Sequence, residues 1–281
     1  MRFSIRGFCL VLLAILVLLA TNFSHAQSRG NRPEAVRSIT DQALLAREAG
    51  DSARELEILE QGINSVGAEN RSAFPIYQLL GQYYADRGNA FQALRVAELQ
   101  KKTAHRPDQE FRTLMKLTSL HASLHQLEKA KQNYKSLQEM MPRLRALPDW
   151  QENGRDWQAS AAFAGANYHT KAGHLAEAEA AWRTCLSFSE SQIGESPERQ
   201  GMMVRQLECT AGLLGVLVSN GMLVEAGAIV AQQRAEIERV VQASRRPALL
   251  YRIAAPLARV AMEQGRLSEA QEILQRALDE L

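Results

Sequence analysis

Histidine, carboxylate and cysteine side chains are the groups that could do chemistry in this chain, and the spacing of the histidines favours no metal site. His121 and His125 lie four residues apart, a spacing that places two ligands on one face of a helix. The sequence offers no third ligand close by. His169 and His174 straddle a glycine turn and lead to the same interpretation. We therefore predict that the chain holds no metal ion.

Carboxylates and nucleophiles form no enzyme motif that we recognise. The sequence contains no G-x-S-x-G elbow, no H-E-x-x-H pair, no P-loop and no dinucleotide-binding glycine run. The acidic residues are scattered and mostly lie near basic residues at helical spacing, which is typical of solvated surface pairs. We predict no catalytic residue, no cofactor and no enzymatic activity. The alternative is an enzyme with its site in the segment 145–155.

Two of the three cysteines fall in the repetitive part of the chain. Cys185 and Cys209 stand near the end of one predicted helix and the start of the next, and such helices pack against each other. A disulfide between them is one interpretation, since it suits an oxidising compartment. The other is a pair of separate buried thiols, because a disulfide requires a narrow geometry that a sequence does not reveal.

Residues 1–26 have the composition of a signal peptide. Arg2 and Arg6 precede an uncharged apolar run from Gly7 to Ala20, and the small residues Ser24 and Ala26 suit a signal peptidase. The apolar run of 14 residues is shorter than the ~20 that a membrane-spanning helix needs. We expect a periplasmic or secreted protein. The alternative is an uncleaved segment that anchors the chain in the inner membrane.

The charge balance argues against nucleic acid as a partner. The chain has 33 basic and 31 acidic residues, and the segment 1–26 removes two basic ones, which leaves 31 of each sign. No basic run with interleaved aromatic residues is present, so we predict no nucleic-acid binding. Aromatic residues are only 6% of the chain, a mixture that favours packed helices over sheets.

One short phrase recurs along the chain and marks a repeated unit. It begins with glycine or histidine and closes with alanine, and the closing alanines are 37, 48, 48 and 44 residues apart. A unit of this size must bury its apolar face against its neighbours. The five copies are 88–93, 125–130, 173–178, 221–226 and 265–270, and a weaker copy is expected within 36–69, with its turn at Gly50.

The clearest unit spans residues 74–107. Tyr77, Leu80-Gly81 and Tyr84 line one face of a helix, Gly88 ends it, and Ala93 and Ala97 follow on a second helix. This pattern resembles the tetratricopeptide repeat, and the longer later units resemble the extended repeats of kinesin light chains. The resemblance implies an all-α fold, a right-handed α-solenoid of stacked helix-turn-helix repeats.

The expected organisation has four parts. Residues 1–26 form the signal peptide, residues 36–144 the N-terminal repeats, residues 145–158 an irregular connection, and residues 159–281 the C-terminal repeats. The connection is expected to be irregular because it contains Pro148, Asn153 and Gly154. Trp150 and Trp157 lie in this segment, either as exposed anchors for a partner or as buried caps on the adjoining units.

The resemblance also implies a binding surface, because such arrays bind a protein or peptide through a groove lined by first helices. We therefore expect a non-catalytic scaffold or adaptor; the alternative is a membrane-anchored accessory or sensor subunit of an envelope complex. The array ends on apolar residues with no polar capping helix, which predicts that another chain, including a second copy, covers this face. The inward positions are Gln78, Gln82, Asp86, Arg112, Met115, Ser119, Phe163, Asn167, Lys171, Arg252, Arg259 and Glu263.

Overall fold

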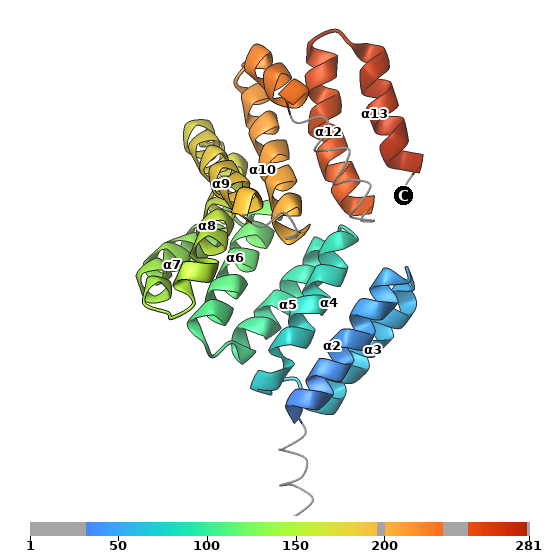
Figure 1. The fold of residues 1–281 in the computed structure, drawn as a ribbon, viewed down its shortest axis with the longest axis vertical. Coiled ribbons are helices and arrows are strands. Elements are labelled where there is room, and N and C mark those ends of the chain that lie inside the picture. Colours follow the sequence, from blue (N-terminus) through green and yellow to red (C-terminus); the bar gives the residue numbers. More distant parts are fainter. Residues whose placement is uncertain (1–31, 196–199, 233–246, 280–281) are drawn as a thin grey trace, which may run out of the picture. The chain divides into compact units, whose positions relative to one another are not determined.

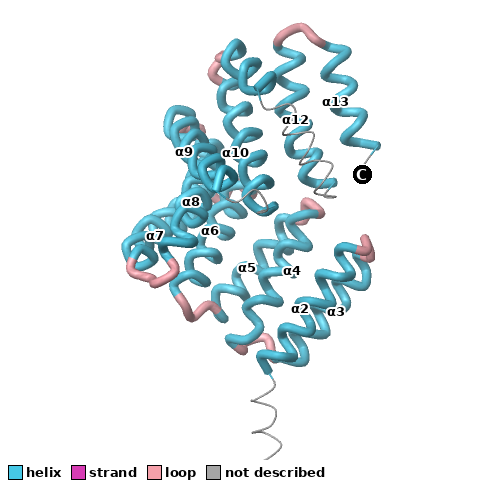
Figure 2. The backbone as a smooth tube through the Cα atoms, viewed as in Figure 1, coloured by secondary structure: helices cyan, strands magenta, loops and turns pink. Residues whose placement is uncertain are grey.

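The computed structural model describes residues 32–195, 200–232 and 247–279, and all regular structure in these ranges is helical (Figure 2). This confirms the predicted all-α class. The expected signal peptide, residues 1–26, lies outside the described residues. Within these ranges, no helix combines the length and the apolar character that membrane crossing requires.

Where the chain is described without a gap, short connections separate successive helices (Figure 1). Residues 223–232 are also helical, between α10 and the next undescribed segment. The other described helices are α2 (Arg32–Glu48), α3 (Ser52–Val66), the 3-10 helix η1 (Arg71–Ala73), α4 (Phe74–Asp86), α5 (Ala90–Thr103), α6 (Pro107–Ser123), α7 (Leu127–Arg145), α8 (Trp150–Ala172), α9 (Leu175–Glu195), α10 (Gln200–Ser219), α12 (Pro247–Glu263) and α13 (Leu267–Asp279).

The chain divides into two compact units, and the boundary falls within α4. Unit 1 comprises Met1–Leu80 and unit 2 comprises Gly81–Leu281. In unit 1, α2 and α3 form a helix pair that packs on η1. The expected weak first repeat around Gly50 is therefore a true helix-turn-helix pair.

The predicted irregular connection, residues 145–158, is wrong over most of its length. Only residues 146–149 separate α7 from α8, and α8 begins at Trp150. Gly154 is buried inside this helix, where a Cβ atom would lie 2.7 Å from Trp150 Cε2. The glycine therefore makes room for a tryptophan ring and does not end a helix. Trp157 is buried, and the partly buried Trp150 packs against its cluster with the two ring centroids 5.8 Å apart, so neither ring is a fully exposed anchor.

The recurring phrase forms one turn geometry throughout the described residues. At Gly88, for example, φ is 69°, Gly88 N donates to Ala85 O, and Asn89 N donates to Tyr84 O at 2.9 Å. This is the Schellman arrangement that satisfies the last carbonyls of a helix. The same pair of hydrogen bonds follows α2, α6, α8, α10 and α12. His125 takes the glycine position with φ of 56°, as its place in the phrase predicts.

The closing alanine of each phrase is a packing residue. Ala93, Ala130, Ala178, Ala226 and Ala270 are all buried. Each lies in the first turn of a second helix, and its N–H donates to the carbonyl four residues earlier. A side chain no larger than a methyl group lets the two helices of a pair approach closely, so the phrase serves both the turn and the packing after it.

In unit 2, successive pairs stack through their first helices. The contacting first helices are α6 with α8, α8 with α10, and α10 with α12, while α5, α7 and α9 each contact the next first helix. This is the stacking expected of a solenoid, in which each pair buries its apolar face on its neighbour. The largest described core cluster of the unit surrounds Trp182, Leu213 and Leu217.

Candidate functional site

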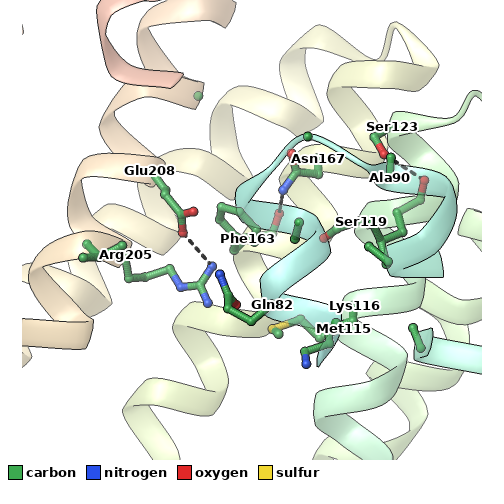
Figure 3. A pocket seen from close by; sticks show the side chains of 18 of the residues that line it. Gln82, Ala90, Met115, Lys116, Ser119, Ser123, Phe163, Asn167, Arg205 and Glu208 are labelled. Atoms are coloured by element: carbon green, nitrogen blue, oxygen red, sulfur yellow. Dashed lines mark hydrogen bonds and ion pairs between the residues drawn. The ribbon is translucent and has the colours of Figure 1, made fainter. Parts of the chain in front are cut away.

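Unit 2 contains a hollow of about 660 Å³, built mainly from the first helices of successive pairs (Figure 3). The stacking of α6, α8 and α10 presents one row of side chains from each helix to the same space, because residues three and four apart share a helix face. Its lining includes Gln82, Gln100, Met115, Lys116, Ser119, Phe163, Asn167, Trp182, Arg205, Glu208 and Gly212.

The structure brings several of the predicted groove residues together. Gln82 from α4, Met115 and Ser119 from α6, and Phe163 and Asn167 from α8 all line the hollow. Their side chains come from three different helices and point to one space (Figure 3).

The remaining predicted groove residues are not among those that line the hollow. Arg112 is partly buried one turn before Lys116, and Lys171, Arg259 and Glu263 are exposed. Asp86 accepts a hydrogen bond from Gln82 Nε2 at 2.6 Å without lining the hollow itself. Gln78 belongs to unit 1, and the side chain of Arg252 lies outside the described part of the chain.

One wall of the hollow is aromatic and carries a held cation. The Phe163 ring meets Trp182 edge to face, with centroids 5.5 Å apart. The Arg205 guanidinium lies 4.2 Å from the Phe163 centroid, within cation–π range. Arg205 Nη1 also pairs with Glu208 Oε2 at 3.3 Å, and both side chains are mostly buried. The guanidinium is therefore fixed against the ring and its charge is balanced on its own helix.

Trp182 is positioned by a glycine and by its own polar edge. A Cβ atom on Gly212 would lie 2.3 Å from Trp182 Cε2, so the indole occupies the space that a side chain on α10 would fill. Trp182 Nε1 donates to Thr170 Oγ1 at 3.1 Å. These contacts join α8, α9 and α10 at the wall of the hollow.

The two cysteines lie one turn from these wall residues. Cys185 of α9 and Cys209 of α10 form a disulfide in the structure, with Cα atoms 5.9 Å apart and both side chains buried. Cys185 follows Trp182 by three residues and Cys209 precedes Gly212 by three. The crosslink therefore joins the two helices close to the point where the indole packs on the glycine.

The opposite side of the hollow is polar. Lys116 Nζ lies 3.5 Å from Gln100 Oε1, at the limit of a hydrogen bond. Burial, and after it the positive charge of Arg112, lowers the pKa of Lys116 to about 8. Gln100 is fully buried, and within the described ranges Gln100 Nε2 and Ser119 Oγ have no hydrogen-bond partner. Polar groups buried in this way are uncommon in folded proteins.

Sequence reasoning missed Lys116, Gln100, Arg205, Glu208 and Trp182 as residues of this site. Lys116 follows the predicted Met115 and precedes the predicted Ser119 by three residues, so a wider reading of that helix face would have included it. Gln100 and Trp182 belong to second helices, which the repeat pattern assigns to the other side of each pair. Only the packed structure brings them to the hollow.

The histidines considered as metal ligands have other surroundings. His121 is buried, with Nδ1 2.8 Å from Gln126 Oε1 and Nε2 3.7 Å from Glu98 Oε1. His125 forms the left-handed turn that follows it. His169 lies among Tyr134, Tyr168 and His174, and burial is the main cause that lowers the pKa of His169. Among the residues that the structure describes, no group of three histidine, cysteine or acidic side chains is placed to hold a metal ion.

Solved structures similar to this chain are TPR-like repeat proteins. One crystal structure of the nearly identical TPR-like repeats of a putative kinesin light chain from Podosopora anserina is 16% identical, with a TM-score of 0.49, over 75% of this chain and 98% of that one. A second structure of these repeats is 17% identical, with a TM-score of 0.47, over 74% and 97%. A tetratricopeptide repeat protein from Parabacteroides merdae is 15% identical, with a TM-score of 0.37, over 88% and 93%. No family model and no curated protein matches the sequence.

Proposed function

We propose that this chain is a non-catalytic interaction scaffold that binds a protein segment in the hollow of unit 2. The observation that supports this most directly is the convergence of Gln82, Met115, Ser119, Phe163 and Asn167, from three successive first helices, on one space. A surface assembled from many helices suits an extended or helical segment, which can contact each helix in turn.

The chemistry of the hollow supports one mode of binding. Phe163 and Met115 offer apolar surface to a side chain of the partner. Asn167 donates from Nδ2 to Phe163 O at 3.0 Å, which fixes the amide and directs its carbonyl oxygen elsewhere. Polar edges of this kind specify orientation, and buried apolar contacts supply most of the affinity.

Export of the chain is part of the proposal. The composition of residues 1–26 and the disulfide between Cys185 and Cys209 both suit an oxidising, extracytoplasmic compartment. N-terminal sequencing of the mature protein tests this, and a first residue of Gln27 is the expected result. A protein that still begins at Met1 and is found in the membrane fraction would favour the membrane-anchored accessory subunit instead.

Self-association is a second candidate interaction, and α13 carries the observation that favours it. Leu267, Leu274 and Leu278 are exposed on this helix, at spacings of seven and four that place them on one side. A second copy that covers this stripe would remove it from water. A mature protein that stays monomeric at high concentration in light scattering would contradict this candidate.

Site-specific photo-crosslinking in intact cells tests the hollow as the binding surface. A benzophenone amino acid at Met115 is expected to capture a discrete protein partner, and Phe163→Glu is expected to abolish that capture. Arg259→Glu is the matched control, since Arg259 is an exposed first-helix residue that does not line the hollow. Equal capture with Phe163→Glu and with Arg259→Glu would overturn the proposal.

A further inference from the structure

The polar side of the hollow contains a hydrogen-bond donor whose direction is fixed. While it is protonated, Lys116 Nζ can only donate, and its 3.5 Å contact is with the carbonyl oxygen of Gln100. The amide nitrogen of Gln100 is then left on the other side. Gln100 is fully buried and lines the hollow, and its Nε2 has no partner among the described residues. An acceptor at this position would satisfy it.

Two further groups on α6 favour the same kind of occupant. Ser119 stands one turn after Lys116 on the same helix face, and its buried hydroxyl lacks a partner within the described part of the chain. Lys116 contributes a positive charge. The amide donor of Gln100, the hydroxyl of Ser119 and the charge of Lys116 together favour an anion with oxygen acceptors over a neutral carbonyl, because hydrogen bonds to ionised groups are stronger.

The charged residues around this wall do not cancel that preference. On α6 itself, Arg112 adds a second positive charge near Lys116. The α5 helix contributes the neutral Gln100, and on α4 the carboxylate of Asp86 is already bonded to Gln82. Across the hollow, Arg205 and Glu208 of α10 pair with each other. Arg112 and Lys116 thus place two positive charges on α6. The carboxylates of Asp86, Glu98 and Glu208 lie next to Gln82, His121 and Arg205, respectively.

The rest of the hollow is suited to an apolar body of limited size. Met115 lies next to Lys116 on α6, and Phe163 and Trp182 form the aromatic wall. A volume of about 660 Å³ is within the range of small-molecule sites. The hollow therefore combines an anion-binding corner with an apolar chamber.

We propose that the hollow binds a small apolar carboxylic acid. Its carboxylate accepts hydrogen bonds from Gln100 Nε2, Ser119 Oγ and Lys116 Nζ, and its apolar body lies against Met115, Phe163 and Trp182. The inference concerns the hollow of the proposed scaffold, but it does not depend on any protein partner. A bound acid would occupy the space that a docked segment needs, so the two ligands would exclude each other.

Binding of 3-phenylpropionate to the purified mature protein tests the inference directly. Titration calorimetry is expected to give binding at least about tenfold tighter for the acid than for its neutral analogue, 3-phenylpropionamide, because a charged acceptor gains most from these donors. Lys116→Met is expected to remove this preference, and Gln100→Leu to weaken binding of the acid by about threefold or more. Lys101→Met, at an exposed lysine, is the control and is expected to change nothing.

The pH dependence gives a readout that a loss of folding does not imitate. Lys116 loses its proton as the pH rises through about 8, so affinity for the acid is expected to fall above that pH, while affinity for the amide stays level. A bound carboxylate stabilises the protonated form of Lys116, so the decrease in affinity is expected at a somewhat higher pH than in the free protein. Unchanged affinity for the acid up to pH 10 would overturn the role of Lys116.

The remaining outcomes separate this inference from the proposed scaffold function. Equal binding of the acid and the amide, or no binding of either, overturns the inference and leaves the crosslinking result untouched. A blocked dipeptide, acetyl-Phe-Glu-amide, that binds more than tenfold tighter than 3-phenylpropionate would show that the corner receives a peptide side chain, and this also overturns it. Competition of the acid with the photo-crosslinked partner would support both proposals.

Discussion

The first turn, in unit 1, and the five later turns, in unit 2, share one backbone geometry but differ in the residue that the turn buries. In the later turns, the fifth residue after the left-handed position is alanine, and it is buried in every case. After Gly50, the same position holds Glu55, which is 1% exposed. Glu55 Oε1 is 2.6 Å from Arg47 Nη2, on the preceding helix. The turn thus tolerates either a small apolar residue or a paired carboxylate.

The difference shows that the backbone turn and the packing behind it are separable. Gly50 has φ of 75° and Asp51 N donates to Ala46 O at 2.9 Å, as in the later turns. Arg47 also donates to the carbonyl of Leu79 at 3.4 Å, so its side chain links α2 both to α3 and to the part of α4 that belongs to unit 1. A buried ion pair of this kind contributes little net stability compared with apolar packing, but loss of one partner is costly.

The largest effect is expected when a carboxylate is placed at a later turn. Ala178→Glu puts a charge at a fully buried position where Thr170 occupies the place that Arg47 has in unit 1. Steric overlap and an unpaired buried charge together are expected to lower the free energy of unfolding by about 4 kcal/mol or more. Chemical denaturation followed by circular dichroism measures this, with Ala176→Glu, at an exposed position, as the control.

A loss of less than about 1 kcal/mol for Ala178→Glu would contradict the packing role of the alanine. Combining Ala178→Glu with Thr170→Arg sharpens the comparison, because it recreates the pair of unit 1 in unit 2. Partial recovery of stability is expected from the double variant. No recovery would show that the first turn depends on features beyond these two side chains.

Removal of one partner in the first turn is expected to have the next largest effect. Glu55→Ala leaves Arg47 with the Leu79 carbonyl but without its carboxylate, and Arg47 is only about a fifth exposed. We expect a loss of about 2–3 kcal/mol, at the lower end for buried pairs because Arg47 retains some contact with water. Hydrogen exchange of α2 and α3 measures it, since this loss should concentrate in unit 1.

The double variant Arg47→Met with Glu55→Ala distinguishes a broken pair from a lost side chain. It restores the alanine of the later turns and removes the charge that needs a partner, so stability close to that of the original chain is expected. Glu57→Ala, which removes an exposed carboxylate two residues further on, should be nearly neutral. If the double variant is as unstable as Glu55→Ala, the pair contributes more than charge compensation.

The sequence was sufficient for the repeat and insufficient for the site, for identifiable reasons. The phrase from Gly88 to Ala93 fixes both a left-handed turn and a buried contact, and each is a local requirement that one residue type meets. The helix through Asn153 and Gly154 was not predicted, because a glycine in a sequence usually indicates a turn. Here the glycine leaves space for the Trp150 ring that covers it. Helix propensity reflects the local backbone preference of a residue, whereas the glycine at 154 is required by side-chain packing.

The hollow shows the same division between local and tertiary information. Met115, Phe163 and Asn167 were predicted because repeat position alone assigns them to one surface. The pairing of Gln100 with Lys116 joins two helices, and the contact of Trp182 with Gly212 joins two others. Arg112, Lys171 and Arg259 hold equivalent repeat positions without lining the hollow. Repeat position therefore selects a face of a helix but not the place where that face becomes concave.

The smallest expected effect comes from the one later turn in which the left-handed residue is not glycine. His125 has φ of 56°, a conformation that side chains with a Cβ atom adopt at a cost. His125→Gly removes this cost but gives the unfolded chain more freedom, so a net gain of about 0.5–1 kcal/mol is expected.

Gly88→Ala imposes the opposite change on the preceding turn, where a Cβ atom would meet no atom within 4 Å. Because the added methyl group contacts no other residue, the expected loss of about 1 kcal/mol in the free energy of unfolding measures only the cost of the left-handed backbone conformation. Thermal unfolding of both variants measures the pair. A destabilised His125→Gly would mean that the imidazole makes contacts worth more than the backbone conformation costs.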